Sequence, residues 1–141
     1  MRDLTRLSIL ATLAFSLLAS SNIYAEDWLN KKEVHELLSG NTAKGHYMRP
    51  SQSTAMMKQV GVKYRFFHDG SGEKATDRFD SSKGLYIEKG KWSVNKKGKL
   101  CTIWGLEEKK KCRRVRRASD GSYELVGKKR NITIEKVTPG T

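Results

Sequence analysis

The sequence has no apolar run long enough to cross a membrane as a helix. Its main apolar stretch, Leu7 to Ser20, falls short of the roughly 20 residues that a bilayer-spanning helix needs. No cysteine follows this stretch, so the sequence also lacks a lipid attachment point there. A membrane anchor is therefore the less favoured of two interpretations of the N-terminal segment.

The favoured interpretation is a secretory signal peptide. Arg2 and Arg6 give a positively charged start, the apolar stretch follows, and Ser21 to Ala25 is a run of mostly small residues that suits cleavage. We therefore predict a signal peptide over residues 1–25, a single β-rich domain over 26–141, and a periplasmic or secreted protein.

Groups for catalysis and metal binding are also sparse. No carboxylate pair, nucleophile with a base, or metal-ligand cluster can be recognised. His68 and Asp69 are adjacent, but neighbours along a strand point to opposite faces. His35 and His46 are scattered, and two cysteines need further ligands to hold a metal. We predict a protein that is not an enzyme and has no metal or cofactor.

The sequence has only two cysteines, Cys101 and Cys112. If a β-hairpin turns about Leu106 and Glu107, the two cysteines lie directly opposite, within the separation that a disulfide requires. Exported chains usually form disulfides, so we predict this pair, with two free buried thiols as the alternative. Closing this loop would contribute about 3 kcal/mol of stability.

One short helix is predicted near the N-terminus of the domain, over residues 31–39. Asn30 and Glu33 have the spacing of a capping box, and Gly40 can end the helix. The apolar residues Val34 and Leu38 recur at helical spacing, so we expect this face to cover a sheet.

The rest of the chain alternates in the manner of short strands joined by tight turns. Asp120-Gly121 is the strongest hairpin signal, and Gly90 is the expected site of a bulge. The predicted strands are residues 46–49, 62–69, 76–79, 85–94, 99–104, 110–118, 123–127 and 131–137. The predicted fold is mainly β: an antiparallel meander of seven or eight strands that closes into a lipocalin-like barrel or half-barrel, with a flatter sandwich as the alternative.

Several short motifs occur in an order that resembles a family of small exported bacterial proteins of unknown function. These are Gly40-Asn41-Thr42, Tyr64 and Phe66 ahead of Asp69-Gly70, Gly90-Lys91-Trp92, Leu100-Cys101 with Trp104, Cys112 and Tyr123. The resemblance implies export and a β-fold but no activity. Gly90-Lys91-Trp92 also resembles the Gly-x-Trp signature of lipocalins, although there it lies on the first strand. That likeness implies a barrel with a small cavity, for which the candidate lining is Tyr64, Phe66 and Trp92.

Positive charge is the strongest functional signal, with 28 Lys and Arg against 15 Asp and Glu. Basic residues that are clustered on a surface attract polyanions. The candidate anion-binding residues are Lys109, Lys110, Lys111, Arg113, Arg114, Arg116, Arg117, Lys128, Lys129 and Arg130. Strand alternation places Arg113 on the face of Val115 and Arg114 on the face of Cys112.

We predict that this basic hairpin binds an acidic glycan or an anionic lipid surface of the cell envelope. Nucleic acid is the less favoured partner, because no nucleic-acid-binding module is recognised. Three alternatives stay open: a charged edge that only prevents strand pairing, a barrel that carries a small apolar ligand, and an inhibitor or partner of another exported protein. We expect a monomer.

Overall fold

The computed structural model describes residues 27–51, 56–77, 84–106 and 109–141. The predicted signal peptide, the hairpin turn at Glu107 and the predicted strand end at Phe79 lie outside these residues. The elements are β1 (Asp27–Trp28), α1 (Lys31–Leu38), β2 (Asn41–Pro50), β3 (Met57–Phe66), β4 (Ser71–Asp77), β5 (Leu85–Val94), β6 (Leu100–Trp104), β7 (Lys111–Arg117), β8 (Tyr123–Val126) and β9 (Asn131–Pro139).

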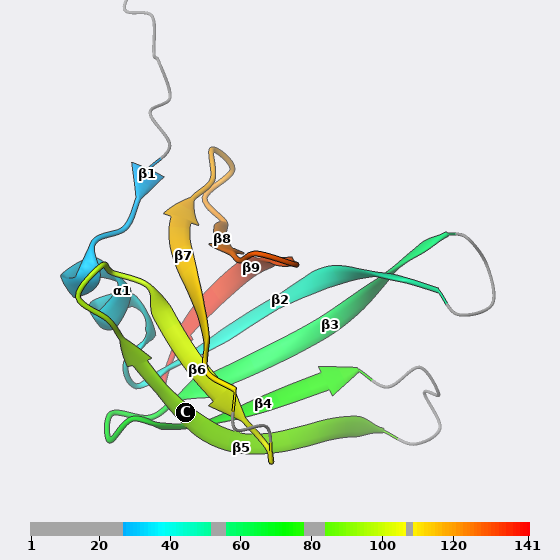
Figure 1. The fold of residues 1–141 in the computed structure, drawn as a ribbon, viewed down its shortest axis with the longest axis horizontal. Coiled ribbons are helices and arrows are strands. Elements are labelled where there is room, and N and C mark those ends of the chain that lie inside the picture. The colour runs from blue at the N-terminus through cyan, green and yellow to red at the C-terminus, as the bar shows by residue number, and fades with distance from the viewer. Residues whose placement is uncertain (1–26, 52–55, 78–83, 107–108) are drawn as a thin grey trace, which may run out of the picture.

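The strands from β2 to β9 form a closed eight-stranded antiparallel barrel (Figure 1). Each strand pairs with the next along the chain, and β9 pairs back with β2 to complete the ring. The predicted meander is therefore confirmed in its closed form, and the half-barrel and the sandwich are excluded. Closure pairs every strand of the barrel with a neighbour on each side, so no strand is a free sheet edge over its whole length.

The up-and-down strand order gives the barrel two different ends. The connections β2–β3, β4–β5, β6–β7 and β8–β9 all lie at one end, which we call the open end. The helix α1 and the remaining connections lie at the other, the helix end. In Figure 1 the hairpins β2–β3 and β4–β5 reach far out at the open end, well away from α1.

Helix α1 begins with the predicted capping box and covers the helix end of the barrel. The Asn30 side chain accepts a hydrogen bond from the backbone N–H of Glu33 at 2.9 Å, and Glu33 accepts one from the backbone N–H of Asn30 at 2.7 Å. Val34 and Leu38 are buried in the barrel core. The chain leaves the helix through Gly40, whose φ of 72° favours glycine.

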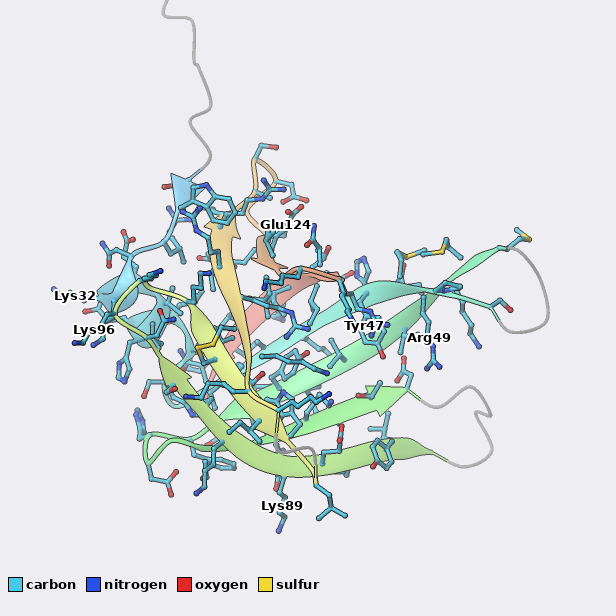
Figure 2. All side chains as sticks on the ribbon, in the orientation of Figure 1. Lys32, Tyr47, Arg49, Lys89, Lys96 and Glu124 are labelled. Atoms are coloured by element: carbon cyan, nitrogen blue, oxygen red, sulfur yellow. A yellow bond between two sulfur atoms is a disulfide. The ribbon has the colours of Figure 1, made fainter. Side chains whose placement is uncertain are left out.

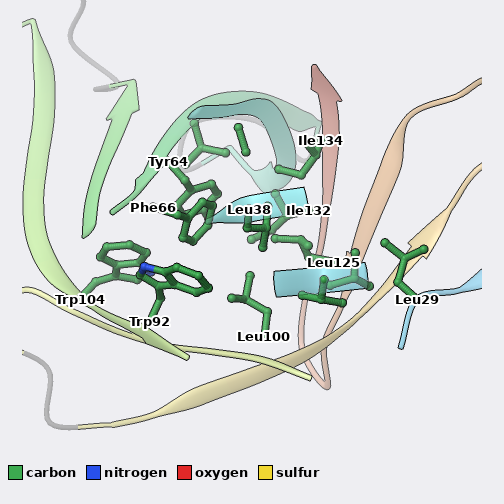
Figure 3. Packing of buried hydrophobic residues seen from close by; sticks show 14 residues of the cluster. Leu29, Leu38, Tyr64, Phe66, Trp92, Leu100, Trp104, Leu125, Ile132 and Ile134 are labelled. Atoms are coloured by element: carbon green, nitrogen blue, oxygen red, sulfur yellow. The ribbon is translucent and has the colours of Figure 1, made fainter. Parts of the chain in front are cut away.

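Aromatic rings fill the barrel interior next to the helix (Figure 3). Phe66 lies edge-on to Trp92 with 5.4 Å between ring centroids, and Tyr64 stacks on Phe66 at 5.7 Å. The Trp92 indole N–H donates to the backbone carbonyl of Phe67 at 2.9 Å. The three residues predicted to line a cavity thus pack against one another in the core.

The bulge expected at Gly90 is wrong. The register of β5 is unbroken on both sides, and an irregularity lies instead in the pairing of β2 with β9, where Lys44 and Gly45 face Lys136 and Ile134 and Glu135 is the extra residue. Gly90 is needed for a close approach, since a Cβ there would lie 2.0 Å from the Ile103 carbonyl oxygen and 2.7 Å from the Trp104 ring. Glycine therefore occurs inside this strand because the neighbouring strand lies too close for a side chain, and not because the strand bulges.

Three strands begin earlier than the sequence suggested. β2 begins at Asn41 rather than His46, β3 at Met57 rather than Val62, and β4 at Ser71 rather than Thr76. Residues 57–59 are exposed on both faces because they project beyond the barrel, so they carry no alternating pattern. His68 lies outside β3, and a hydrogen bond of 2.9 Å joins its ring Nδ1 and the Ser39 hydroxyl.

The predicted disulfide is confirmed. Cys101 and Cys112 lie directly opposite on β6 and β7 and are joined by a bond of 2.05 Å. The strands β6 and β7 pair only over Leu100 to Thr102. The disulfide therefore reinforces one of the shortest pairings in the barrel.

Candidate anion-binding site

The ten basic residues predicted as one surface occupy three different places. Lys109, Lys110, Lys111, Lys128, Lys129 and Arg130 lie at the open end, in or beside the β6–β7 and β8–β9 connections. Arg113 lies on the interior face of β7, and Arg114, Arg116 and Arg117 lie near β1. The faces predicted by strand alternation are confirmed, but the residues do not form a single patch.

The arginines near β1 hold that strand in place. β1 pairs with β7 at Arg116 and Arg117, on the side that β6 has left. The guanidinium of Arg114 lies 3.9 Å from the centroid of the Trp28 ring, and that of Arg116 lies 5.5 Å from it. Arg116 also donates to the Glu124 carboxylate at 2.8 Å. These cation–π and ionic contacts give the arginines a structural role.

Arg117 is engaged in the same region. Its guanidinium lies 3.2 Å from the Asp27 carboxylate and 5.8 Å from the centroid of the Tyr123 ring. A side-chain hydrogen bond with Tyr123 raises the pKa of Arg117. Arg114, Arg116 and Arg117 are thus less available to a ligand than the cations of the open end.

Arg113 differs from its neighbours because it faces the interior. It lies opposite the buried Leu100, and its side chain packs over Gly127, where a Cβ would lie 3.1 Å from the arginine Nε. Within the described residues, Nε of Arg113 is buried without a hydrogen-bond partner. A buried donor that is not satisfied costs free energy, and such groups often belong to binding sites.

A groove with a volume of about 690 Å³ opens between β2 and the β8–β9 connection. It forms because β2 pairs with β9 only from Asn41 to His46, whereas β2 itself continues to Pro50. Tyr47 stands at the start of this extension (Figure 2). The lining residues are His46, Tyr47, Met48, Pro50, Met57, Gly127, Lys128, Lys129, Arg130, Asn131 and Thr133.

The groove has two chemically different walls. Lys128, Lys129 and Arg130 form a cationic wall, and Met48 and Met57 contribute apolar surface from the β2–β3 hairpin. The Arg130 guanidinium lies 4.3 Å from the centroid of the Tyr47 ring. This contact joins the two walls and holds a charged group against an aromatic face.

Tyr64 lies in the core, within the electrostatic influence of two of the candidate cations. Burial raises the pKa of Tyr64 far above its ordinary value, and the positive charges of Arg113 and Arg130 partly oppose this shift. Both guanidinium groups are thus near enough to act on the tyrosine hydroxyl. The acid Glu88 is neutralised by Lys74, whose Nζ lies 2.6 Å from a Glu88 carboxylate oxygen.

The raised pKa of Tyr64 predicts a loss of stability in alkali. Below pH ~10, the ordinary pKa of tyrosine, the phenol is neutral in both the folded and the unfolded state. At higher pH only the unfolded state releases this proton, so the free energy of unfolding falls by up to about 1.4 kcal/mol per pH unit. Denaturant unfolding of the wild type and Tyr64→Phe from pH 8 to 11 should show a steeper alkaline decline for the wild type. Parallel profiles would contradict the assignment.

Sequence reasoning found the cations of the groove but missed the wall that they face. Tyr47, Met48 and Pro50 have no distinctive pattern, and β2 was expected to be a short strand. The methionines were the available signal, since Met56 and Met57 stand in a polar stretch. Whether such residues pack in a core or line a groove depends on where β9 ends.

Two other features of the described residues bear on the site. They hold no group of three or more histidine, cysteine, aspartate and glutamate side chains placed to bind a metal ion. No helix in that part of the chain has the length and apolar character to cross a membrane.

Comparisons with known proteins leave the site to be interpreted from its own geometry. No protein-family model matches the sequence, no curated protein matches it, and no solved structure matches the fold.

Proposed function

We propose that this chain is an exported, non-enzymatic binding protein whose groove holds an anionic amphiphile of the cell envelope. The observation that carries the proposal is the pairing of two walls in one groove. Lys128, Lys129 and Arg130 face an acidic head group, while Met48 and Met57 face an apolar portion. Export follows from the predicted signal peptide, and the envelope supplies anionic amphiphiles.

The two walls favour an amphiphile over the other ligand classes. A wholly apolar ligand would cover Lys128 and Lys129 without pairing their charges, at a cost in desolvation. An acidic glycan would satisfy the cations but gain little from the methionines. An amphiphile with a phosphate or carboxylate head uses both walls, and the planar Arg130 guanidinium suits bidentate contact with such a head.

A titration with dodecyl phosphate, below its critical micelle concentration, tests the proposal. Isothermal titration calorimetry should show binding of this probe to the wild type. Lys128→Gln/Lys129→Gln/Arg130→Gln should weaken it at least about tenfold, because each charge-assisted hydrogen bond contributes roughly 1.5–3 kcal/mol. Binding should also weaken as salt is raised.

The turn Lys96-Lys97-Gly98-Lys99 at the helix end offers a matched control. Lys96→Gln/Lys97→Gln/Lys99→Gln removes the same amount of charge far from the groove, and it should bind dodecyl phosphate as the wild type does. The neutral dodecyl maltoside tests the head group and should bind much more weakly. Equal weakening by both triple variants, or equal affinity for both amphiphiles, would overturn the proposal.

A further inference from the structure

We propose that the open end of the barrel docks onto the surface of an anionic lipid bilayer. The large hydrophobic residues that are exposed in the described part of the chain all lie at this end. They are Met48, Met56, Met57, Leu85, Tyr86, Ile87 and Leu106. The helix end carries none of them, so the exposed apolar surface is segregated to one end of the molecule.

These residues come from three separate hairpins. The methionines belong to β2–β3, Leu85 to Ile87 begin β5, and Leu106 follows β6. Leu85 is 51% exposed, Ile87 is 60% exposed, and Leu106 is fully exposed. Exposed apolar groups gathered in this way mark a surface that contacts a partner or a membrane.

Basic residues stand among the apolar ones. Lys109 and Lys110 follow Leu106 on the β6–β7 connection after two acidic residues, Glu107 and Glu108. Lys89 lies close after Ile87 on β5, and Lys128 and Lys129 lie on the β8–β9 connection. All five are exposed. Lysines at a membrane surface are attracted to anionic head groups, while nearby apolar side chains insert into the boundary with the acyl chains.

The arrangement suits a bilayer better than a folded protein partner. The apolar residues stand on three hairpins that are separate in Figure 1, and lysines lie close to them in the sequence. A protein interface usually has a closely packed apolar core with few charges. A lipid surface is deformable and accepts each hairpin separately. The excess of cations makes an anionic surface the complementary one.

This docking surface extends beyond the groove, with which it shares Met48, Met57, Lys128 and Lys129. Its other apolar residues, on β5 and directly after β6, contribute nothing to the groove lining. Substitutions at Leu85, Ile87 and Leu106 therefore test the docking surface without touching the proposed amphiphile site.

The experiment is flotation with vesicles of phosphatidylcholine, alone or mixed with an equal part of phosphatidylglycerol. The wild type should bind the mixed vesicles about tenfold more tightly than the neutral ones. Leu85→Ser/Ile87→Ser/Leu106→Ser should lose about tenfold in affinity for the mixed vesicles while still binding dodecyl phosphate. Lys89→Gln/Lys109→Gln/Lys110→Gln should also bind more weakly, whereas Lys96→Gln/Lys97→Gln/Lys99→Gln should bind as the wild type does.

Thermal unfolding monitored by circular dichroism checks that the variants are folded, and the single variant Leu106→Ser replaces the triple variant if that one unfolds. Wild-type affinity of the serine variant for mixed vesicles would overturn the proposal. No preference of the wild type for anionic vesicles would also overturn it. Sedimentation equilibrium tests whether a second copy of the chain, instead of a bilayer, occupies this surface. A wild-type dimer that the serine substitutions abolish would assign these residues to a dimer interface and overturn the proposal.

Discussion

Replacing Phe66 with alanine is expected to lower the free energy of unfolding by about 3–5 kcal/mol. Phe66 is 1% exposed and lies between Tyr64 and Trp92, with ring centroids 5.7 and 5.4 Å away. Removing its ring would leave a cavity in the centre of the barrel core, and both neighbouring rings would lose contacts. Urea unfolding followed by tryptophan fluorescence measures the change.

The next residue offers a matched control. Phe67 carries the same side chain but lies directly after β3, where it is only half-buried. Its backbone accepts the Trp92 indole N–H and donates to Ser71, and both contacts survive truncation of the side chain. Phe67→Ala should therefore cost less than half as much as Phe66→Ala. Equal losses in the two variants would show that Phe66 is not central to the core.

Removing the disulfide is expected to lower the free energy of unfolding by about 3 kcal/mol. The bond between Cys101 and Cys112 closes a short loop in the unfolded chain, and in the folded chain it joins strands with a short pairing. Cys101→Ala/Cys112→Ala should show this loss in urea unfolding under oxidising conditions.

Reduction provides the control for the disulfide. Dithiothreitol should lower the stability of the wild type by a similar amount and leave the double alanine variant unchanged. Wild-type stability that does not respond to complete reduction would show that the cross-link does not constrain the unfolded chain.

The fold was largely predictable because its signals are local. The alternation of Val62, Tyr64 and Phe66 marks one buried face of a strand, and all three are buried in the barrel. Asp120-Gly121 lies in the β7–β8 turn, where the Asp120 carboxylate accepts hydrogen bonds from the backbone N–H and the hydroxyl of Ser122. Side-chain hydrogen bonds of this kind fix a turn without help from the rest of the chain.

The candidate site was only partly predictable, because its parts are distant in the sequence. The cations Lys128 to Arg130 were identified as a group, but Tyr47 and Met57, which share their groove, stand on other strands. The role of Arg114 also depends on Trp28, which β1 brings against it. In the sequence these arginines and lysines are equivalent positive charges. In the structure they differ, because some line the groove and others contact aromatic or acidic side chains.

The sequence by itself determined the meander of strands, the capped helix, the disulfide and the faces on which Arg113 and Arg114 lie. These features depend on residue spacing and on contacts between adjacent segments. Only the tertiary structure decided that β9 pairs with β2 and that β2 extends beyond this pairing, which leaves a groove. It also decided that the side chain of Arg113 faces the interior beside Gly127. The physical reason is that relative strand lengths and barrel closure depend on pairing between the two ends of the chain, which no local pattern encodes.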